Sequence, residues 1–525
     1  MTVATQPPRS YDVIGFGDEV PGVLALVGAA REYRRRTGKG LRTLLMFKGN
    51  SQAGVGGHLV RGGLAYLDRC ALPPDIRQSF GLPTFGDPAA IYQEFLQRSG
   101  VVQIGLDPRK ADATLRAMLS EVGADIISRV QIQSVVRDGT KLTGIQLTTG
   151  SVFLGSQFID SSVNAELAQA AGVKKLQGFG TFGLPESELP VTLVFESQGL
   201  SIQRLKDIEL GYLKRFTNPN DAEAQRYIAI AAGSDPALMD QIRKSFVDDH
   251  GSLKTMYVGQ DHIDVRSQAL TVTYHAFRGK KMVLADSGVL LDQANIAILP
   301  NSRLSWNALM FYVTGSQAEA LARGAAQPTP AMLQEMTFVE QWLKSFGATA
   351  VKPAVELYIR HAGNIQGAVA PLSGAQMLLG GVPAGEAIGT FGYHLDVRGG
   401  ITGLGNKAAA KGIGSVSFHQ PPLFNIGIGH ALVRDVPNLA VVSPASGFDG
   451  YACAAGRIVE FNTAVGNGVG IAASIALCSN RNLANISNSE VRQVLAATGK
   501  LPRIYGQSNA LEASRLQDFE TTLIA

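Results

Sequence analysis

Residues 11–25 read YDVIGFGDEVPGVLA, and this stretch decides the fold. A buried strand, a glycine turn and an apolar helix are expected there, in that order. A second apolar strand is expected over residues 41–47. A strand–helix–strand unit of this kind binds the pyrophosphate of a dinucleotide at the N-terminus of its helix. The opening of the chain therefore predicts a dinucleotide cofactor, with a strand–helix turn that holds no ligand as the alternative.

The glycines of this turn fit the dinucleotide pattern in two ways. If Gly15 and Gly17 form the first pair, the third glycine, Gly22, comes two residues late. If Gly17 comes first, Gly22 takes the third position and Glu19 the middle one, and the strand keeps its usual length. An ionised carboxylate in the middle position would repel a phosphate. Glu19 must then point away, or the phosphate is displaced, or the site is degenerate.

The second strand is expected to end at Phe47 and Lys48. Dinucleotide folds usually place an acidic residue there to hold a ribose hydroxyl, so the ribose contact stays unassigned. Lys48 either meets a 2′-phosphate or is a solvated lysine at the end of a strand. A loop with Gly56, Gly57 and Gly63 follows, and repeated glycines let the backbone approach a bulky ligand.

The composition indicates a large globular protein that binds neither nucleic acid nor metal. Its 525 residues are 45% hydrophobic and 17% charged, which allows a large core, and a net charge of +4 does not favour nucleic acid. Cys70, Cys453 and Cys478 form no paired motif, which favours a reducing compartment and gives no metal site. No signal peptide is expected over residues 1–10 and no stretch reaches membrane-spanning length, so we expect a soluble cytoplasmic protein.

The remaining elements follow in a regular order. Before residue 175 we expect a helix over 107–122, strands over 125–127, 130–136, 142–148 and 151–159, and a helix over 165–172. The less legible middle of the chain has expected helices over 221–244 and 330–346 and a strand over 268–274. After it we expect strands over 426–432 and 438–442, a helix over 462–477, and a last helix opened by a capping box at Ser487–Glu490.

In this order the chain resembles the FAD-dependent oxidoreductases of the glutathione-reductase type. The resemblance rests on the 17–22 turn, the 55–63 loop, residues 111–172, the segments 358–361 and 392–396, and the closing stretch 438–470. It implies an α/β fold, with a Rossmann-like FAD-binding domain of the glutathione-reductase type and an inserted α+β substrate domain. The expected parts are 1–175 and 421–480 for FAD, 176–420 for the substrate, and a helical tail over 481–525.

The resemblance also implies a set of FAD-binding residues on the segments that match the family's motifs. They are Gly17, Glu19, Gly22, Lys48, Gly56, Gly57, His58, Gly63, Asp160, Arg457, Gly466 and Gly470. In the family, the helix that contains the last two glycines points its N-terminus at the pyrimidine edge of the flavin, where a positive dipole stabilises the reduced form. Glu19, Phe47 and Val163 depart from the family's pattern.

The activity that the resemblance implies is hydride transfer between a small organic substrate and non-covalently bound FAD. Histidine is the readiest base near neutral pH, and His394 is close in sequence to Arg398, which would bind an acidic substrate. With Arg360, these are the predicted catalytic residues. Two alternatives stay open: a flavin-dependent isomerase or desaturase that uses no nicotinamide, and a non-catalytic binding protein on a degenerate flavoprotein scaffold.

The position of Glu19 gives a first prediction. If its carboxylate opposes the pyrophosphate, Glu19→Gly should tighten FAD binding, because the substitution removes a repulsive charge. A flavin titration of both proteins measures this effect. An unchanged affinity would show that the side chain points elsewhere.

Overall fold

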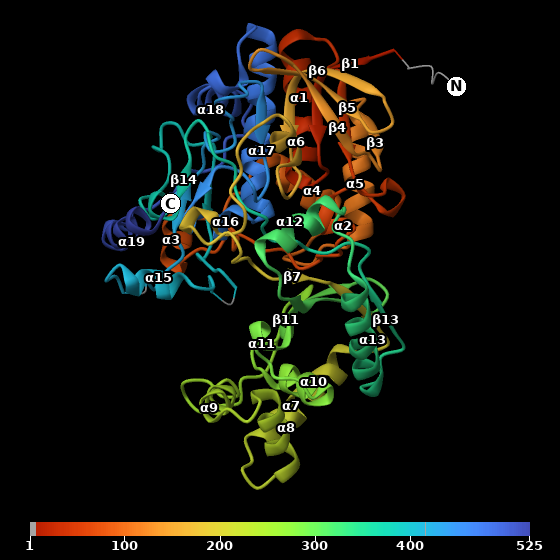
Figure 1. Ribbon diagram of the computed structural model, residues 1–525, viewed down its shortest axis with the longest axis vertical. Helices are drawn as coiled ribbons and strands as arrows, with labels where there is room; N and C mark the ends of the chain where they lie inside the picture. The colour runs from red at the N-terminus through yellow and green to blue at the C-terminus, as the bar shows by residue number, and fades with distance from the viewer. Residues whose placement is uncertain (1–6, 399, 415, 525) are drawn as a thin grey trace.

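The computed structural model describes residues 7–398, 400–414 and 416–524. It contains a Rossmann-like sheet, a second sheet from the middle of the chain, and a C-terminal region that shares the core of the first unit (Figure 1). The second sheet and its helices extend away from the other parts, toward the bottom of the view. Residues 1–6, which belong to the segment expected not to be a signal peptide, lie outside the described residues.

The first sheet is parallel at its centre and has an antiparallel extension. Its strand order is β3-β2-β1-β6-β5-β4, with β17 also paired to β6. The strands are β1 (Arg9–Phe16), β2 (Thr43–Phe47), β3 (Asp125–Ser128), β4 (Ile132–Asp138), β5 (Lys141–Leu147), β6 (Val152–Asp160) and β17 (Leu439–Val441). The strands expected before residue 160 are confirmed, with small shifts at their ends.

Both faces of this sheet are buried at its centre, at β1 and β2. Val13 and Leu45 belong to the core cluster that includes α1, whereas Ile14 and Leu44 belong to a cluster on the opposite face. Adjacent residues of one strand therefore enter different cores, which explains the continuous apolar runs of β1 and β2. The helices of this unit are α1 (Val20–Thr37), α2 (Gly57–Val60), α3 (Pro74–Ser79), α4 (Ala90–Arg98), α5 (Pro108–Glu121) and α6 (Glu166–Ala170).

The turn between β1 and α1 starts at Gly17, while Gly15 lies inside the strand. Gly17 has φ = +91°, and a Cβ atom there would lie 2.3 Å from the backbone nitrogen of Ser162. A Cβ atom at Gly22 would lie 2.2 Å from the hydroxyl oxygen of Ser161. These two glycines therefore let β1, α1 and the end of β6 meet closely, as the alignment that starts at Gly17 requires.

Helix α17 (Val459–Ser479) packs directly against the backbone of α1. A Cβ atom at Gly466 would lie 2.4 Å from the carbonyl oxygen of Pro21, and one at Gly470 would lie 2.2 Å from that of Ala25. Because the contacts advance together along both helices, the helices run parallel. Pro21 is in the first turn of α1 but Gly466 is about two turns into α17, so α17 begins roughly 9 Å before α1 at about 1.5 Å per residue.

By length and hydropathy α17 would be able to cross a membrane, which corrects the expectation that no stretch reaches that length. The mean hydropathy of its most apolar window is 1.3, and 89% of that window is buried inside the protein. A helix at the centre of a large core has the same properties, because apolar neighbours surround it. The helix expected over 462–477 is longer than predicted, because it begins at Val459 and ends at Ser479.

The middle of the chain forms a sheet whose strand pairs are antiparallel. Its order is β13-β8-β12-β11-β10-β9, with β7 also paired to β12. The strands are β7 (Val191–Thr192), β8 (Phe195–Gln198), β9 (Tyr257–Val258), β10 (His262–Asp264), β11 (Val289–Leu299), β12 (Arg303–Phe311) and β13 (Ala350–Pro353). The helices beside it are α7 (Ile202–Phe216), α8 (Ala222–Ala232), α9 (Pro236–Lys244), α10 (Ala269–Arg278), α11 (Leu284–Ser287), α12 (Gly315–Arg323) and α13 (Pro330–Ser345).

Two expectations for this region were wrong, while the helix expected over 330–346 is confirmed as α13. Residues 269–274 lie in helix α10 rather than in a strand, and Gln268 is the N-cap of this helix. Residues 269–275 are all buried, and a short apolar run that is buried on every side does not distinguish a strand from a helix. The single helix expected over 221–244 is two helices, α8 and α9. Gly233 ends the first in a left-handed conformation, and Pro236 opens the second.

The C-terminal region is fastened by α19 (Ala510–Leu523). Glu520 of this helix is buried, and its carboxylate accepts hydrogen bonds from the backbone N–H groups of Gly374, Ala375 and Tyr451. The other elements are β14 (Leu372–Ser373), α14 (Gly374–Leu378), β15 (Thr390–Gly392), α15 (Leu404–Ala410), β16 (Leu423–Asn425), β18 (Phe448–Asp449), α16 (Ala452–Gly456) and α18 (Asn488–Ala497). The predicted capping box of α18 is confirmed.

The strand expected over 426–432 is a further correction, because these residues form turns and an isolated bridge. Gly427 and Gly429 bring the backbone against the side chains of Asn488 and Ala370, which leaves no place for a neighbouring strand. The division of the chain into parts at residues 175, 420 and 480 stays a prediction.

The contact between α1 and α17 gives a stability prediction. Gly470→Ala would place a methyl group 2.2 Å from the Ala25 carbonyl oxygen, so we expect it to lower the free energy of unfolding by about 2–3 kcal/mol. Gly211 of α7 is the matched control, because it is exposed and a Cβ atom there meets nothing within 4 Å. Gly211→Ala should be neutral or stabilise by up to about 1 kcal/mol. Denaturant unfolding measures both variants, and equal stabilities would contradict the contact.

Candidate functional site

Two helix N-termini face the same side of the first unit, and no described side chain caps either of them. Helix α1 begins after Glu19 and helix α17 begins after Ile458. An uncapped N-terminus offers backbone N–H groups and a positive dipole to an anion. Because the helices are parallel, their two positive ends point in one direction with the stagger of roughly 9 Å derived above.

A small cavity lies at each end. The cavity at α1, called here the α1 cavity, has a volume of about 80 Å³ and is lined in part by Gly17, Lys48 and Ser162. The α17 cavity has a volume of about 10 Å³, and His58 and Arg457 are in its wall. Small-molecule and cofactor sites usually have volumes of roughly 300–1,000 Å³. Side chains therefore fill most of the space that a dinucleotide would need between the two helix ends.

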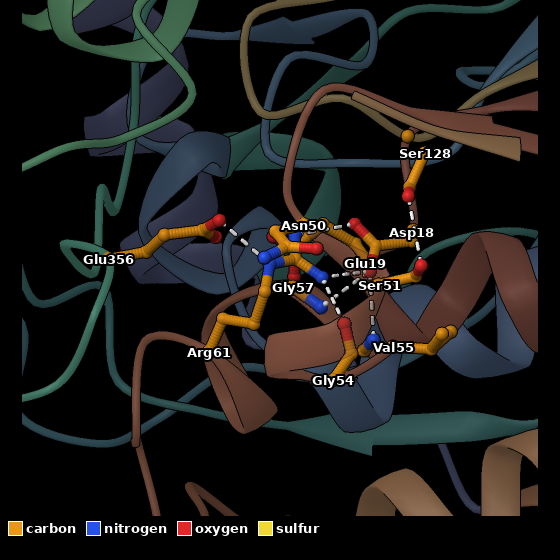
Figure 2. Close-up of polar contacts among 12 residues, drawn as sticks. Asp18, Glu19, Asn50, Ser51, Gly54, Val55, Gly57, Arg61, Ser128 and Glu356 are labelled. Carbon is orange, nitrogen blue, oxygen red and sulfur yellow. Dashed lines mark hydrogen bonds and ion pairs between the residues drawn. The ribbon is translucent and has the colours of Figure 1, made fainter. Parts of the chain in front are cut away.

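Asp18 fills part of this space (Figure 2). Its Oδ2 accepts hydrogen bonds from the backbone N–H groups of Gly56 at 2.9 Å and Gly57 at 3.2 Å. The Arg61 guanidinium donates to both carboxylate oxygens of Asp18. Burial raises the pKa of Asp18, but Arg61 and the backbone donors outweigh this and hold the pKa below its ordinary value. Asp18 is thus an ionised carboxylate inside the protein.

Arg61 links this carboxylate to a segment that is distant in sequence. Its Nε donates to Oε1 of Glu356 at 2.7 Å, and its guanidinium carbon lies 4.9 Å from the centre of the Phe47 ring. Burial raises the pKa of Glu356 to about 7. Arg61 opposes this rise, whereas the charges of Asp18 and Glu19 add to it. Glu356 therefore changes its charge near neutral pH.

Glu19 turns toward the glycine loop. Its Oε1 accepts a hydrogen bond from the backbone N–H of His58 at 3.2 Å, and its Oε2 contacts Nδ1 of the same histidine. Gly57 has φ = +51°, and a Cβ atom there would lie 2.2 Å from Oε1 of Glu19. The His58 ring stacks on Tyr358 with 4.9 Å between ring centres. The Glu19 carboxylate therefore accepts a hydrogen bond from the glycine loop, which was predicted to lie beside the flavin.

The other predicted cofactor residues lie around this network. Lys48 pairs with Glu166 at 2.8 Å in the wall of the α1 cavity. Asp160 accepts hydrogen bonds from the backbone N–H groups of Ser162 and Ala168, so it holds the turn after β6 in shape. Burial raises the pKa of Asp160 to about 6 against these hydrogen bonds. Asp160 therefore stabilises the turn after β6 and is not part of the wall of the α1 cavity.

Three predicted glycines allow segments to pack closely. Gly63 has φ = +66°, and a Cβ atom there would lie 3.1 Å from the side chain of Ala354. Gly466 and Gly470 meet the backbone of α1, as described above. Their role in this structure is to fix how α17 sits on α1, which in turn fixes where the N-terminus of α17 lies.

Most of the residues predicted on the substrate side form one cluster beside the α17 cavity. The Arg360 guanidinium carbon lies 4.5 Å from the centre of the Tyr358 ring, and Arg457 donates to the Tyr358 hydroxyl at 3.4 Å. Arg457 also lies 3.5 Å from Asp396, which contacts Arg398. The structure therefore brings the three predicted arginines together around one tyrosine and one carboxylate.

Arg360 differs from the other two arginines because no described carboxylate pairs with it. It is 2% exposed, and it donates to the carbonyl oxygen of Pro190 at 2.8 Å and to the Thr192 hydroxyl at 2.7 Å. Burial, with Arg398 and Arg457 nearby, lowers its pKa to about 10. His394 lies two residues from Asp396 in sequence and is exposed.

A family profile described as FAD dependent oxidoreductase matches residues 12–495. The chain belongs to this family. FAD is the cofactor of these oxidoreductases, so the predicted family and cofactor are both confirmed. No curated protein sequence matched the chain.

Solved structures of other proteins are similar to this chain at low identity. One is L-proline dehydrogenase from P. horikoshii, with 9% identity, 94% of this chain and 100% of that chain covered, and a TM-score of 0.34. Another is pqsL, a probable FAD-dependent monooxygenase from Pseudomonas aeruginosa, with 10% identity, coverages of 98% and 97%, and a TM-score of 0.36. At these TM-scores the similarities do not indicate a substrate.

The backbone of the site fits FAD, but its side chains do not leave room for the whole cofactor. Gly17 and Gly22 remove the Cβ atoms at the turn, and the helix behind them is uncapped. Asp18, Glu19 and Arg61, however, occupy the space between that helix end and the glycine loop. FAD would be held by the turn and the two helix ends, with these side chains rearranged.

Sequence reasoning missed the network of Asp18, Arg61 and Glu356. A second acid beside Glu19, at a turn that should bind a phosphate, was an available signal, as was an arginine three residues after His58 in the glycine loop. Glu356 gave no signal, because it lies 295 residues from its partner Arg61. In the described residues, no group of three or more His, Cys, Asp or Glu side chains is placed to hold a metal ion.

Glu356 gives a prediction about pH. Its pKa is about 7 in the folded protein and 4.5 ordinarily, so its favourable contribution to stability is present below about pH 4.5 and is lost as the pH rises through about 7. The contribution is at most ~3.5 kcal/mol at about 1.4 kcal/mol per pKa unit. We expect the native protein to lose more stability between about pH 5 and about pH 8 than Glu356→Gln, which does not titrate. Thermal unfolding of both proteins checks this, and parallel pH profiles would contradict the raised pKa.

Proposed function

We propose that this protein transfers a hydride between a small organic anion and non-covalently bound FAD. The observation that carries the proposal is the pair of uncapped, parallel helix ends with their stagger of roughly 9 Å. The end of α1 suits a diphosphate, and the end of α17 suits the ring of a flavin, whose reduced form is anionic. The family match supports this use of the two ends.

In this proposal the backbone of the 17–22 turn binds the diphosphate, and the glycine loop lies against it. FAD supplies the hydride acceptor when it is bound. The positive end of α17, together with Arg457 two residues before its first residue, would stabilise negative charge on the reduced flavin. The close packing of the α17 glycines on α1 holds the two helix ends in place.

The burial of Arg360 without a carboxylate partner favours an anion as the substrate. A guanidinium buried without a carboxylate partner is costly, and a substrate carboxylate would supply the missing negative charge through charge-assisted hydrogen bonds. Tyr358 connects Arg360 to Arg457 at the α17 cavity, so an anion bound at Arg360 would lie next to the flavin end of the site. His394 would take the substrate proton and pass it to solvent, because it is exposed. Arg398, held by Asp292 at 2.8 Å, would be a second anchor.

We propose further that the fold is of the glutathione-reductase type, with the parts that the sequence predicts. The antiparallel extension β4-β5 and the return of β17 to β6 from the far end of the chain support this. A cytoplasmic location is proposed because Cys70, Cys453 and Cys478 are all unpaired.

A second candidate function is a binding protein that performs no redox chemistry. The filled space between α1 and the glycine loop favours it, because a protein that has lost its cofactor has no reason to keep that space open. The same measurement separates the two candidates. We expect a visible absorption spectrum of the freshly purified protein to show two flavin bands, which denaturation releases into the supernatant. A colourless protein that takes up no added FAD would leave the binding protein as the function.

The role of Arg360 gives a kinetic prediction. Carboxylates that bleach the bound flavin under anaerobic conditions identify a substrate. For such a substrate we expect Arg360→Met to raise KM about tenfold or more, because the substitution removes a charge-assisted contact. The uncharged amide of the same substrate is the control, and its kinetics should not change. Equal KM values for the carboxylate in both proteins, at equal FAD content, would exclude this anchor.

A further inference from the structure

The glycine loop presents a cluster of hydrogen-bond donors to two carboxylates of the chain itself. The backbone N–H groups of Gly56 and Gly57 donate to Asp18, and that of His58 donates to Glu19. The Arg61 guanidinium adds two donors to Asp18. We call these three N–H groups and the guanidinium the anion cradle. Successive backbone N–H groups of this kind form concave sites that bind anions, phosphates among them.

The loop adopts an unusual backbone conformation to form this cradle. Gly56 has φ = +131° and Gly57 has φ = +51°, and L side chains rarely adopt such angles. A Cβ atom at Gly56 would also lie 2.5 Å from the Val60 side chain and 2.7 Å from that of Leu115. Consecutive residues in such conformations are often found where a protein binds a ligand, because the close approach of the backbone is useful there.

The cradle and its two carboxylates lie between the α1 cavity and the α17 cavity. Asp18, Glu19 and Arg61 are in the wall of the first cavity, and His58 is in the wall of the second. Glu19 bridges the two, because its carboxylate contacts both the backbone and the ring of His58. A dinucleotide that reaches from one helix end to the other must therefore pass through the volume that these side chains fill.

We propose that Asp18 and Glu19 are internal occupants of the anion cradle, which hold the place of the FAD diphosphate until the cofactor displaces them. The inference rests on the proposed function, since it assumes that FAD enters this site. A carboxylate satisfies the same donors as a phosphate oxygen, so the chain forms an ordered site without cofactor. FAD then binds in exchange for the internal contacts of two carboxylates, and its diphosphate enters beside them.

The test is a flavin titration of the full-length apoprotein and its variants by fluorescence quenching. Glu19→Gln and Asp18→Asn each remove one charge from the cradle and keep the shape of the side chain. Asp112→Asn is the matched control: Asp112 accepts a hydrogen bond from the Val55 N–H of the same loop at 2.7 Å, but it lies outside the cradle. Riboflavin is the ligand control, because it carries no phosphate.

We expect Glu19→Gln and Asp18→Asn each to tighten FAD binding about tenfold or more, because each removes a competing charge. Riboflavin affinity should be the same in all four proteins, and Asp112→Asn should bind FAD as the native protein does. Glu19 is the safer position, because its side chain is 16% exposed whereas that of Asp18 is a buried partner of Arg61. If Asp18→Asn does not fold, Glu19→Gln alone decides the question.

Three results would overturn the inference, and they differ in what they say about the proposed function. If native protein and Glu19→Gln bind FAD equally, the carboxylates do not compete with the cofactor, but the flavoenzyme function stands. If neither the native protein nor any folded variant binds FAD, both the inference and the flavoenzyme function fail. Tighter binding of riboflavin as well would also contradict the inference, because the effect would then not arise at the diphosphate.

Discussion

The close parallel packing of α1 on α17 is the constraint on which the rest of the site depends. Gly466 and Gly470 let the two backbones meet where any Cβ atom would collide with a carbonyl oxygen. This contact fixes the stagger of the helix ends, and with it the two positions where positive dipoles face the site. The long apolar run of α17 follows from the same constraint, because a helix that packs on neighbours all round must be apolar all round.

The second feature of the site is a pair of carboxylates, Asp18 and Glu19, in the place where a dinucleotide fold receives phosphates. A buried guanidinium is stable only beside anionic partners, and Arg61 pairs with Asp18 and Glu356. Phe47 stands where an acid would hold a ribose hydroxyl, and its ring packs against Arg61 instead. The departures from the family's pattern at Glu19 and Phe47 are therefore connected, since both belong to the surroundings of one arginine and one glycine loop.

The sequence predicted the Rossmann-like unit well because its signals are local. Apolar runs and glycine turns each act within a few residues, and β1, α1, β2 and the meander of β4 and β5 were all found from such signals. The middle of the chain was harder. Helix α10 was read as a strand because its burial comes from elements that are distant in sequence. For the site, the sequence placed Glu19 at the turn, but it did not show where the carboxylate points.

The sequence by itself determined the family, the cofactor and the order of the strands and helices before residue 175, because these depend on short motifs and on hydrophobic periodicity. Only the tertiary structure decided which groups meet. Arg61 and Glu356 are 295 residues apart, and Arg360 and Arg457 are brought to one tyrosine from two distant segments. The physical reason is that ion pairs and hydrogen bonds form over a few ångströms in space. A local sequence pattern does not show which distant residue the fold will bring to that distance.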